Sequence, residues 1–192
     1  MRPEPTPSVK FTYDDFVNFP DDGKRHEIID GEHYVTPSPN TSHQRIATNL
    51  TVAIGSYLKR HLVGEVFAAP FDVVFSNLDV VEPDVLYISR ERSGILTDQH
   101  VSGAPDLVVE ILSPGTRKTD EVTKRKLYER SDVRDYWVVD PELELVKIYR
   151  RLEGRFSKAA ELALERGDAL TTPLLPGFSA ALADLFKSPF SG

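Results

Sequence analysis

The chain has 192 residues, of which 40% are hydrophobic and 28% charged, and this composition is typical of one ordinary globular domain. It contains no apolar run of about 18 residues, so no membrane span is predicted, and its first residues lack the apolar core of a secretory signal. The net charge of −7 argues against a general nucleic-acid coat protein. Cysteine is absent, which excludes disulfides and thiolate metal sites and favours a cytoplasmic protein.

The N-terminal region divides into a loose segment and the start of a folded domain. Residues 1–10 are rich in proline and predict a loose segment, and residues 11–192 predict a single domain. Residues 11–19 predict a short helix, because Thr12 is a good N-cap residue before an amphipathic stretch.

A β-hairpin is predicted over residues 25–35. Asp30 and Gly31 are a strong signal for a two-residue type I′ turn, which needs positive φ at both positions. Side chains alternate between the two faces of a strand, so this turn fixes the faces of the hairpin. One face carries Glu27, Ile29, Glu32 and Tyr34, and the other carries His26, Ile28, His33 and Val35.

Residues 42–62 form the clearest predicted helix. Apolar side chains recur there at helical spacing, and Ser42 is a suitable cap. Strands are predicted over residues 65–76 and 83–89. Residues 106–112 form a continuous apolar run apart from Glu110, as expected for a central strand that is covered on both faces.

The C-terminal half alternates helix and strand. A helix is predicted from Thr119 to about Ser131, then strands over residues 135–140 and 143–152, and a last helix over residues 179–186. The order of elements along the whole chain predicts an α/β fold in which helices pack on a mixed sheet.

Glu110 is the first candidate functional residue, because it interrupts the apolar run of a predicted central strand. A buried, isolated carboxylate costs several kcal/mol unless it is paired, bound to metal or protonated. Glu110 comes just before the Ser113-Pro114 break, so it would lie near the rim of the sheet at the carboxyl end of its strand, where α/β proteins usually bind ligands. A simple ion pair with Lys or Arg is the alternative interpretation.

Asp84 is the second candidate, at the start of the strand that follows Pro83. Two carboxylates from neighbouring strands and a backbone carbonyl can hold a Mg²⁺-type ion, which prefers oxygen ligands and keeps several waters. Asp106 also follows a proline, but it lies about 13 Å along the strand from Glu110 and is interpreted as structural.

The predicted helix that begins at Thr119 supplies a cation. Asp120, Lys124 and Tyr128 share one face of it, and that face points back towards the sheet. A surface ion pair between Lys124 and Asp120 is the alternative. Residues 115–134 carry seven Lys or Arg and four Asp or Glu, a local excess of positive charge that fits either phosphate binding or a solvated helix.

Three histidines also deserve consideration. His43 is in line with the apolar face of its predicted helix and therefore points inward, as many structural core histidines do. His26 and His33 share a hairpin face, so a zinc hydrolase is a further alternative, although no H-E-x-x-H motif supports it.

With these residues identified, the chain resembles the PD-(D/E)XK nuclease superfamily, in its Uma-type branch of restriction-endonuclease-like proteins. The resemblance covers the chain from residue 11 to residue 186 and rests on several motifs in order. They are HEIIDGE (26–32), PSPNTSHQRIATNL (37–50), EPDVLYI (82–88), GAPDLVVEILSPGTRKTDEVTKRKLY (103–128) and VRDYWVVDP (133–141).

The resemblance implies a restriction-endonuclease-like mixed β-sheet flanked by helices. It matches Asp84 to the superfamily's strand Asp and Glu110 to its second acidic residue. The superfamily usually places its Lys two positions later, where this chain has Leu112, whereas the Uma-type branch carries the Lys on the following helix, here Lys124. The branch's acidic residue in the HEIIDGE motif is Glu27, and its histidine at the helix start is His43.

The function implied is hydrolysis of DNA phosphodiester bonds that depends on Mg²⁺ or Mn²⁺. The expected metal ligands are Asp84, Glu110 and the carbonyl of Ile111, with Lys124 orienting water or stabilising the transition-state charge. Glu27 would hold a second ion or a water. The remaining site residues are His43, Asp120 and Tyr128, which would support the ligands, and Arg117 and Lys118, which would contact phosphates.

Three further expectations complete the sequence analysis. A homodimer is compatible with a nuclease of this type, because such enzymes often cut both strands. A non-catalytic module that binds nucleic acid or protein on the same scaffold is the main alternative function, since a fold does not fix an activity. Substitution of Glu110 or Lys124 by Ala is expected to abolish cleavage without unfolding the chain.

Overall fold

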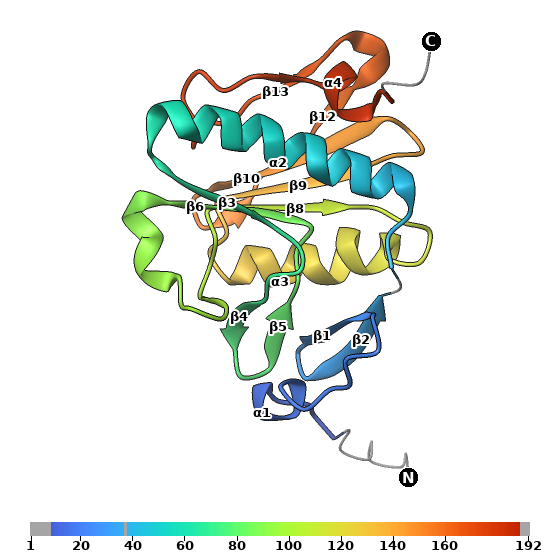
Figure 1. Cartoon of the computed structure of the whole chain (residues 1–192), viewed down its shortest axis with the longest axis vertical. Helices are drawn as coiled ribbons and strands as arrows, with labels where there is room; N and C mark the ends of the chain where they lie inside the picture. Colours follow the sequence, from blue (N-terminus) through green and yellow to red (C-terminus); the bar gives the residue numbers. More distant parts are fainter. Residues whose placement is uncertain (1–8, 37, 189–192) are drawn as a thin grey trace.

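The computed structural model describes residues 9–36 and 38–188, and it is a mixed α/β structure built around a seven-stranded sheet (Figure 1). The strand order is β11-β10-β9-β8-β6-β3, and β12 also pairs with β10. The strands are β3 (Gly64–Ala68), β6 (Val85–Ser89), β8 (Leu107–Ile111), β9 (Asp135–Asp140), β10 (Leu145–Leu152), β11 (Arg155–Phe156) and β12 (Ala160–Ala163).

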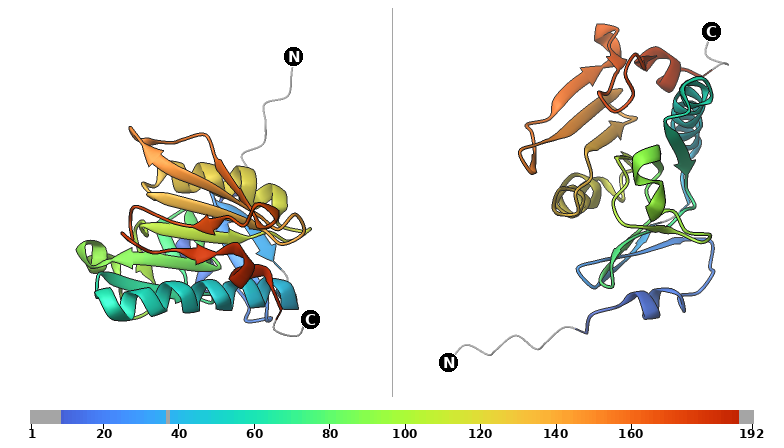
Figure 2. Two further views of the ribbon diagram at one scale, coloured as in Figure 1. Left: turned by 90° about the horizontal axis from the view of Figure 1, so that it is seen from above. Right: turned by 90° about the vertical axis from the view of Figure 1, so that its left-hand side faces the viewer.

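Helices cover both faces of this sheet. Helix α2 (Thr41–His61) lies on one face and α3 (Arg125–Arg130) on the other (Figure 2). Strand β8 is parallel to β9, and α3 lies in the connection between them, as a parallel pair requires. All five residues of β8 are buried, which confirms the predicted central strand.

The alternation along β8 decides which helix Glu110 faces. Val109 and Ile111 belong to the apolar cluster that includes the buried side chains of α2. Val108 and Leu112 belong to the other cluster, which includes those of α3. Because side chains two apart share a face, Glu110 points to the α3 side of the sheet.

A second, five-stranded sheet packs below α3 in the orientation of Figure 1, in the order β2-β1-β5-β4-β7. Its strands are β1 (Arg25–Ile29), β2 (Glu32–Thr36), β4 (Val73–Ser76), β5 (Asp79–Val81) and β7 (Val101–Ser102). The other elements are α1 (Tyr13–Phe16), α4 (Leu182–Phe186), the two-stranded sheet of β13 (Ala169–Leu170) and β14 (Ala180–Ala181), and 3-10 turns at Arg90–Ile95 and Leu164–Arg166.

The predicted hairpin is confirmed in both turn and register. Asp30 and Gly31 have φ of 54° and 75°, as a type I′ turn requires. Glu27 lies opposite Tyr34, so the two share a face as expected. The short N-terminal helix is also present, and Thr12 donates its backbone N–H and its hydroxyl to the Asp15 carboxylate, each at 2.8 Å.

Several predicted boundaries were wrong. The single strand expected over residues 65–76 is two strands in different sheets, because the chain turns at Ala69–Pro70 and proline has no N–H for a ladder. Strand β5 was not expected. Asn40, not Ser42, caps α2, since the Asn40 side chain accepts a hydrogen bond from the His43 N–H at 2.9 Å. The last helix is shorter than predicted and begins at Leu182.

The predicted helix over residues 119–131 is present with an unusual start. Thr119–Lys124 is π-helical and Arg125–Arg130 is α-helical. Short π-helical stretches are often found at functional sites. Asp120, Lys124 and Tyr128 are all buried, so the predicted inward face is confirmed.

The loose segment predicted over residues 1–10 falls mostly outside the described residues. Lys10, which is described, donates from Nζ to the Asp30 carbonyl at 2.7 Å. No helix in residues 9–36 or 38–188 combines the length and the apolar character needed to cross a bilayer.

Candidate functional site

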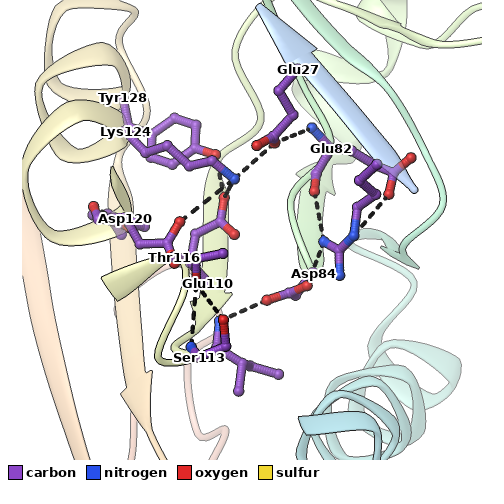
Figure 3. Close-up of polar contacts among 12 residues, drawn as sticks. Glu27, Glu82, Asp84, Glu110, Ser113, Thr116, Asp120, Lys124 and Tyr128 are labelled. Atoms are coloured by element: carbon purple, nitrogen blue, oxygen red, sulfur yellow. Dashed lines mark hydrogen bonds and ion pairs between the residues drawn. The ribbon is translucent and has the colours of Figure 1, made fainter. Parts of the chain in front are cut away.

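Glu110 is held at the centre of a buried polar cluster on the α3 side of the sheet (Figure 3). Its Oε1 accepts a hydrogen bond from the Tyr128 hydroxyl at 2.5 Å and one from Lys124 Nζ at 3.0 Å. Glu110 lines a cavity, and its Oε2 has no hydrogen bond to any residue that the structure describes. One oxygen of Glu110 is therefore fixed by the protein and the other is available to a ligand.

Lys124 neutralises more than one carboxylate. Its Nζ lies 2.8 Å from Glu27 Oε1 and 3.7 Å from Asp120 Oδ1, in addition to its contact with Glu110. Glu27 Oε1 also accepts a hydrogen bond from the Glu82 N–H at 2.8 Å. The predicted convergence of Lys124 on Glu110 is present, and the ammonium group is held among three acidic side chains.

Asp84 is bonded through both of its oxygens. Oδ1 lies 2.7 Å from Arg25 Nη1. Oδ2 accepts a hydrogen bond from the Ile111 N–H at 2.7 Å and lies 3.0 Å from His43 Nε2. His43 therefore contacts a predicted metal ligand from the first turn of α2.

Negative charge exceeds positive charge in this cluster. The described residues place five carboxylates, those of Glu27, Glu82, Asp84, Glu110 and Asp120, around the two permanent cations Arg25 and Lys124. Burial raises the pKa of Glu110 well above its ordinary value, and the charges of neighbouring carboxylates add to it. Such crowding favours the uptake of a cation or of protons.

The other pKa values of the cluster are also shifted. Burial raises the pKa of Asp120 to about 6 and that of Glu82 to about 7. Burial also acts to raise the pKa of Asp84, but hydrogen bonding to His43 and the charge of Arg25 outweigh it, so that this pKa is lowered. The pKa of Lys124 is raised because the charges of Glu110 and Glu27 outweigh the effect of burial.

A cavity of about 180 Å³ opens onto the cluster. The charged and titratable residues that line it are Arg25, His43, Asp84, Glu110, Asp120 and Lys124. Ser38, Pro39 and Asn40, which precede α2, and the loop from Ser113 to Thr116 also line it. Glu27 and Tyr128 are not among the lining residues, and both contact lining residues from behind.

The donor set fits a hard divalent cation in its chemistry. The available ligands are carboxylate oxygens, which Mg²⁺ and Mn²⁺ prefer, and the local excess of negative charge favours a cation. Among the described residues, no group of three or more His, Asp or Glu side chains is already arranged to hold a metal ion. An ion bound by Asp84 and Glu110 would therefore keep several water ligands, as Mg²⁺ commonly does.

The two predicted phosphate-binding residues differ in their surroundings. Arg117 forms a bidentate pair with Asp140, at 2.5 and 3.2 Å, and contacts Glu142 at 3.1 Å. Lys118 is exposed and has no ion pair with any described residue. The charge of Arg117 is thus already neutralised by the protein, whereas that of Lys118 is free.

Asp106 is structural, as expected. It is fully buried, lies 3.0 Å from Arg134 Nη1, and accepts a hydrogen bond from the Ser89 N–H at 2.7 Å. The zinc alternative gains no support from the hairpin. His26 Nδ1 and His33 Nε2 lie 2.9 Å apart in a direct hydrogen bond, and His26 Nε2 pairs with Asp22 at 3.0 Å.

Arg25 and Glu82 are parts of the cluster that were not predicted. Arg25 Nε lies 3.2 Å from Glu82 Oε1 and Nη1 bonds to Asp84. A signal for Arg25 was present in the sequence, because in β1 it lies two positions before Glu27 and so shares its face. Glu82 had no comparable signal, since its role depends on how β1 packs beside β5.

The raised pKa of Asp120 makes a prediction about stability. The folded state holds this proton up to about pH 6, whereas an unfolded aspartate releases it near pH 4, so folded protein binds more protons in between. The free energy of unfolding should therefore fall by ~2 kcal/mol from this residue as pH rises from 4 to 7. Asp120→Asn is expected to flatten that part of the pH profile in urea titrations.

The control for this experiment is Glu121→Gln on the same helix, since Glu121 is partly exposed and pairs with Lys147 at 2.7 Å. It should leave the slope between pH 4 and 7 unchanged. A wild-type slope that Asp120→Asn does not alter would contradict the assignment of this proton to Asp120.

The fold and the acidic cluster with its lysine define a restriction-endonuclease-like protein. The model of the Uma2 family, described as "Putative restriction endonuclease", matches residues 13–183, and the chain belongs to this family. The solved structure of a protein described as a putative nuclease of DUF820, from Anabaena variabilis ATCC 29413, is similar with a TM-score of 0.77. It is 22% identical in sequence, and the match covers 92% of this chain and 97% of that chain.

The structural similarity establishes the fold, and family and fold together indicate a nuclease-like protein. No curated protein matches the chain.

Proposed function

We propose that the protein is an endonuclease that hydrolyses phosphodiester bonds in DNA and requires Mg²⁺ or Mn²⁺. The observation that carries this proposal is the buried cluster in which Glu110 presents one free oxygen to the cavity while Lys124 and Tyr128 hold the other. If Glu110 and Lys124 formed only a structural ion pair, that pair would not require an unbonded Glu110 oxygen, an excess of acidic groups and an open cavity at the same place.

Each residue of the cluster has a part in the proposed mechanism. Asp84 and Glu110 would hold the ion, which supplies Lewis-acid polarisation of the phosphate and a more acidic bound water. Lys124, which lines the cavity, would stabilise the negative charge that develops on the phosphoryl oxygens. Glu27 was expected to hold a second ion or a water, but it does not line the cavity, and its contact with Lys124 supports a positioning role instead. His43 orients Asp84 in the same way.

The start of α2 supports phosphate binding next to this cluster. Asn40, the N-cap of α2, lines the same cavity. The N-terminus of a helix carries a partial positive charge and unpaired N–H groups, which favour an anion. A phosphate in the cavity would therefore lie between this helix end and the Lys124 ammonium.

The test compares two buried aspartates, of which Asp84 lines the cavity and Asp106 does not. Asp84 and Asp106 each follow a proline, and each pairs with an arginine and a backbone N–H. Asp84→Asn should abolish nicking of supercoiled plasmid in Mg²⁺ or Mn²⁺ and weaken binding of the ion in calorimetry. Asp106→Asn should keep the activity per folded molecule.

Equal activity in both variants, or wild type that binds no divalent ion and cuts nothing, would refute the nuclease proposal. The second result would favour the non-catalytic binding module. Sedimentation of the protein with and without DNA would show in the same preparation whether a homodimer forms.

Lys118 and Arg117 make a matched pair for phosphate contacts. Lys118→Ala should weaken binding of a short DNA duplex a few-fold and reduce the slope of log K against log salt by about one. Arg117→Ala should have a smaller effect on both quantities, because Asp140 and Glu142 already neutralise its charge. Fluorescence anisotropy at several salt concentrations measures both. A larger effect from Arg117 would contradict this assignment.

A further inference from the structure

The guanidinium of Arg25 lies beside Asp84, where a metal ion bound by that carboxylate would also have to lie. Its side chain is 16% exposed, and its Nη1 lies 2.7 Å from Asp84 Oδ1. The carboxylate of Asp84 is 3% exposed, and Arg25 is the only Lys or Arg among the described residues that contacts it. The guanidinium is therefore the cationic side chain that lies against this buried carboxylate, beside its contact with His43.

This contact conflicts with the role of Asp84 as a metal ligand. The other oxygen, Oδ2, is bonded to the Ile111 N–H and to His43, so Oδ1 is the atom that an ion would approach. A divalent ion and a guanidinium bound to the same oxygen would lie only a few ångströms apart and would repel strongly. Arg25 and a divalent ion thus compete for Asp84.

The Arg25 guanidinium has a second terminal nitrogen, Nη2, that can donate hydrogen bonds to a ligand. Arg25 Nη2 has no hydrogen bond to any of the described residues. Arg25 lines the 180 Å³ cavity and also a neighbouring cavity of about 290 Å³, which shares His43 and Asp84 with it. The side chain therefore lies between the two cavities, where it could contact a DNA backbone.

Glu82 keeps the arginine in place if the contact with Asp84 is lost. Its Oε1 lies 3.2 Å from Arg25 Nε, and its backbone carbonyl accepts from Nη1 at 3.2 Å. A guanidinium presents its N–H groups in a planar fork that matches two phosphate oxygens, which an ammonium group cannot do. Small rotations about the Nε end would turn that fork from Asp84 towards the cavity.

We propose that Arg25 is a phosphate-binding catalytic residue that rests on Asp84 in the metal-free protein and moves to the scissile phosphate when a divalent ion binds Asp84. This inference rests on the proposed nuclease function and adds to it a residue outside the Asp84, Glu110 and Lys124 set.

The proposal makes predictions of opposite sign for one variant. Arg25→Ala should bind Mn²⁺ more tightly than wild type, on the order of tenfold, because the competing charge is gone. It should bind a short DNA duplex without metal within about twofold of wild type, because Arg25 then rests on Asp84, and should lose plasmid nicking by about 10²-fold or more. Arg25→Lys keeps the charge but not the fork, so it should bind Mn²⁺ like wild type and still nick poorly.

The experiment measures Mn²⁺ binding by calorimetry, metal-free duplex binding by anisotropy, plasmid nicking and thermal unfolding on the same preparations. Arg130→Ala is the control, because Arg130 also joins two carboxylates, Asp79 at 2.6 Å and Asp30 at 2.8 Å, but lines neither cavity. It should lose stability without changing binding or nicking. If Arg25→Ala does not fold, Arg25→Gln also removes the charge and provides the same comparison.

The outcomes separate the two proposals. Weaker or unchanged Mn²⁺ binding in Arg25→Ala, or undiminished nicking per folded molecule, would overturn the role of Arg25 while wild-type nicking upholds the nuclease. Wild type that neither binds Mn²⁺ nor nicks would refute the nuclease function itself, and the role of Arg25 with it.

Discussion

Lys124→Met is expected to lower the free energy of unfolding by about 3–5 kcal/mol at pH 8, because removal of one partner leaves buried charges uncompensated. Lys124 is 4% exposed, and it is the only Lys or Arg among the described residues that contacts Glu27 and Glu110. Methionine fills a similar volume without the charge. Both carboxylates would then have to take up protons or remain buried as unpaired anions.

The size of this effect should depend on pH in a definite direction. At pH 5 the carboxylates of the variant can hold protons, so the loss of stability should be smaller than at pH 8. Urea unfolding at the two pH values measures the difference. Lys126→Met, an exposed lysine of the same helix, is the control and should change stability by less than about 0.5 kcal/mol. An equal loss at both pH values would show that packing, not charge, is responsible.

This prediction changes the expectation that Lys124→Ala abolishes cleavage without unfolding the chain. The sequence places Lys124 on the correct face of the helix, but it does not show that three acidic groups surround the ammonium group. An inactive Lys124 variant therefore proves a catalytic role only if its folded fraction is measured.

Glu110→Gln provides the cleaner test of chemistry, with an expected loss of plasmid nicking of about 10³-fold. That factor corresponds to about 4 kcal/mol of transition-state stabilisation, within the several kcal/mol that a bound metal ion supplies. The amide has the shape of the carboxylate, and its oxygen can still accept from Tyr128 and Lys124 as Oε1 does. The variant loses the charge and the free anionic oxygen that faces the cavity.

Thermal unfolding of Glu110→Gln should match or exceed that of wild type at pH 8, because burial raises the pKa of Glu110 and a neutral group avoids that cost. Divalent-ion binding in calorimetry should weaken together with nicking. Asp135→Asn is the control, a buried carboxylate at the other end of the neighbouring strand that accepts from Thr172 at 2.8 Å. Retention of metal-dependent nicking in Glu110→Gln would remove Glu110 from the site.

Local periodicity was sufficient to bring much of the candidate cluster together. The period of two along β8 places Glu110 on the α3 face, and the helical period places Asp120, Lys124 and Tyr128 opposite it. The inward direction of His43 followed in the same way from the apolar face of α2. These predictions succeeded because each depends on side-chain direction within one regular element.

Contacts between elements distant in sequence were decided only by the tertiary structure. Arg25 reaches Asp84 because the five-stranded sheet packs beside the start of β6, and Arg117 is neutralised by Asp140 because the segment after β8 lies beside the end of β9. The split of residues 65–76 into strands of two sheets belongs to the same class. The sequence by itself thus determined the family, the central strand and the residues that face the cavity from β8 and the following helix. Only the packing decided which cation pairs with each buried carboxylate. Charge pairing acts through space between distant residues, so it produces no periodic pattern in the sequence.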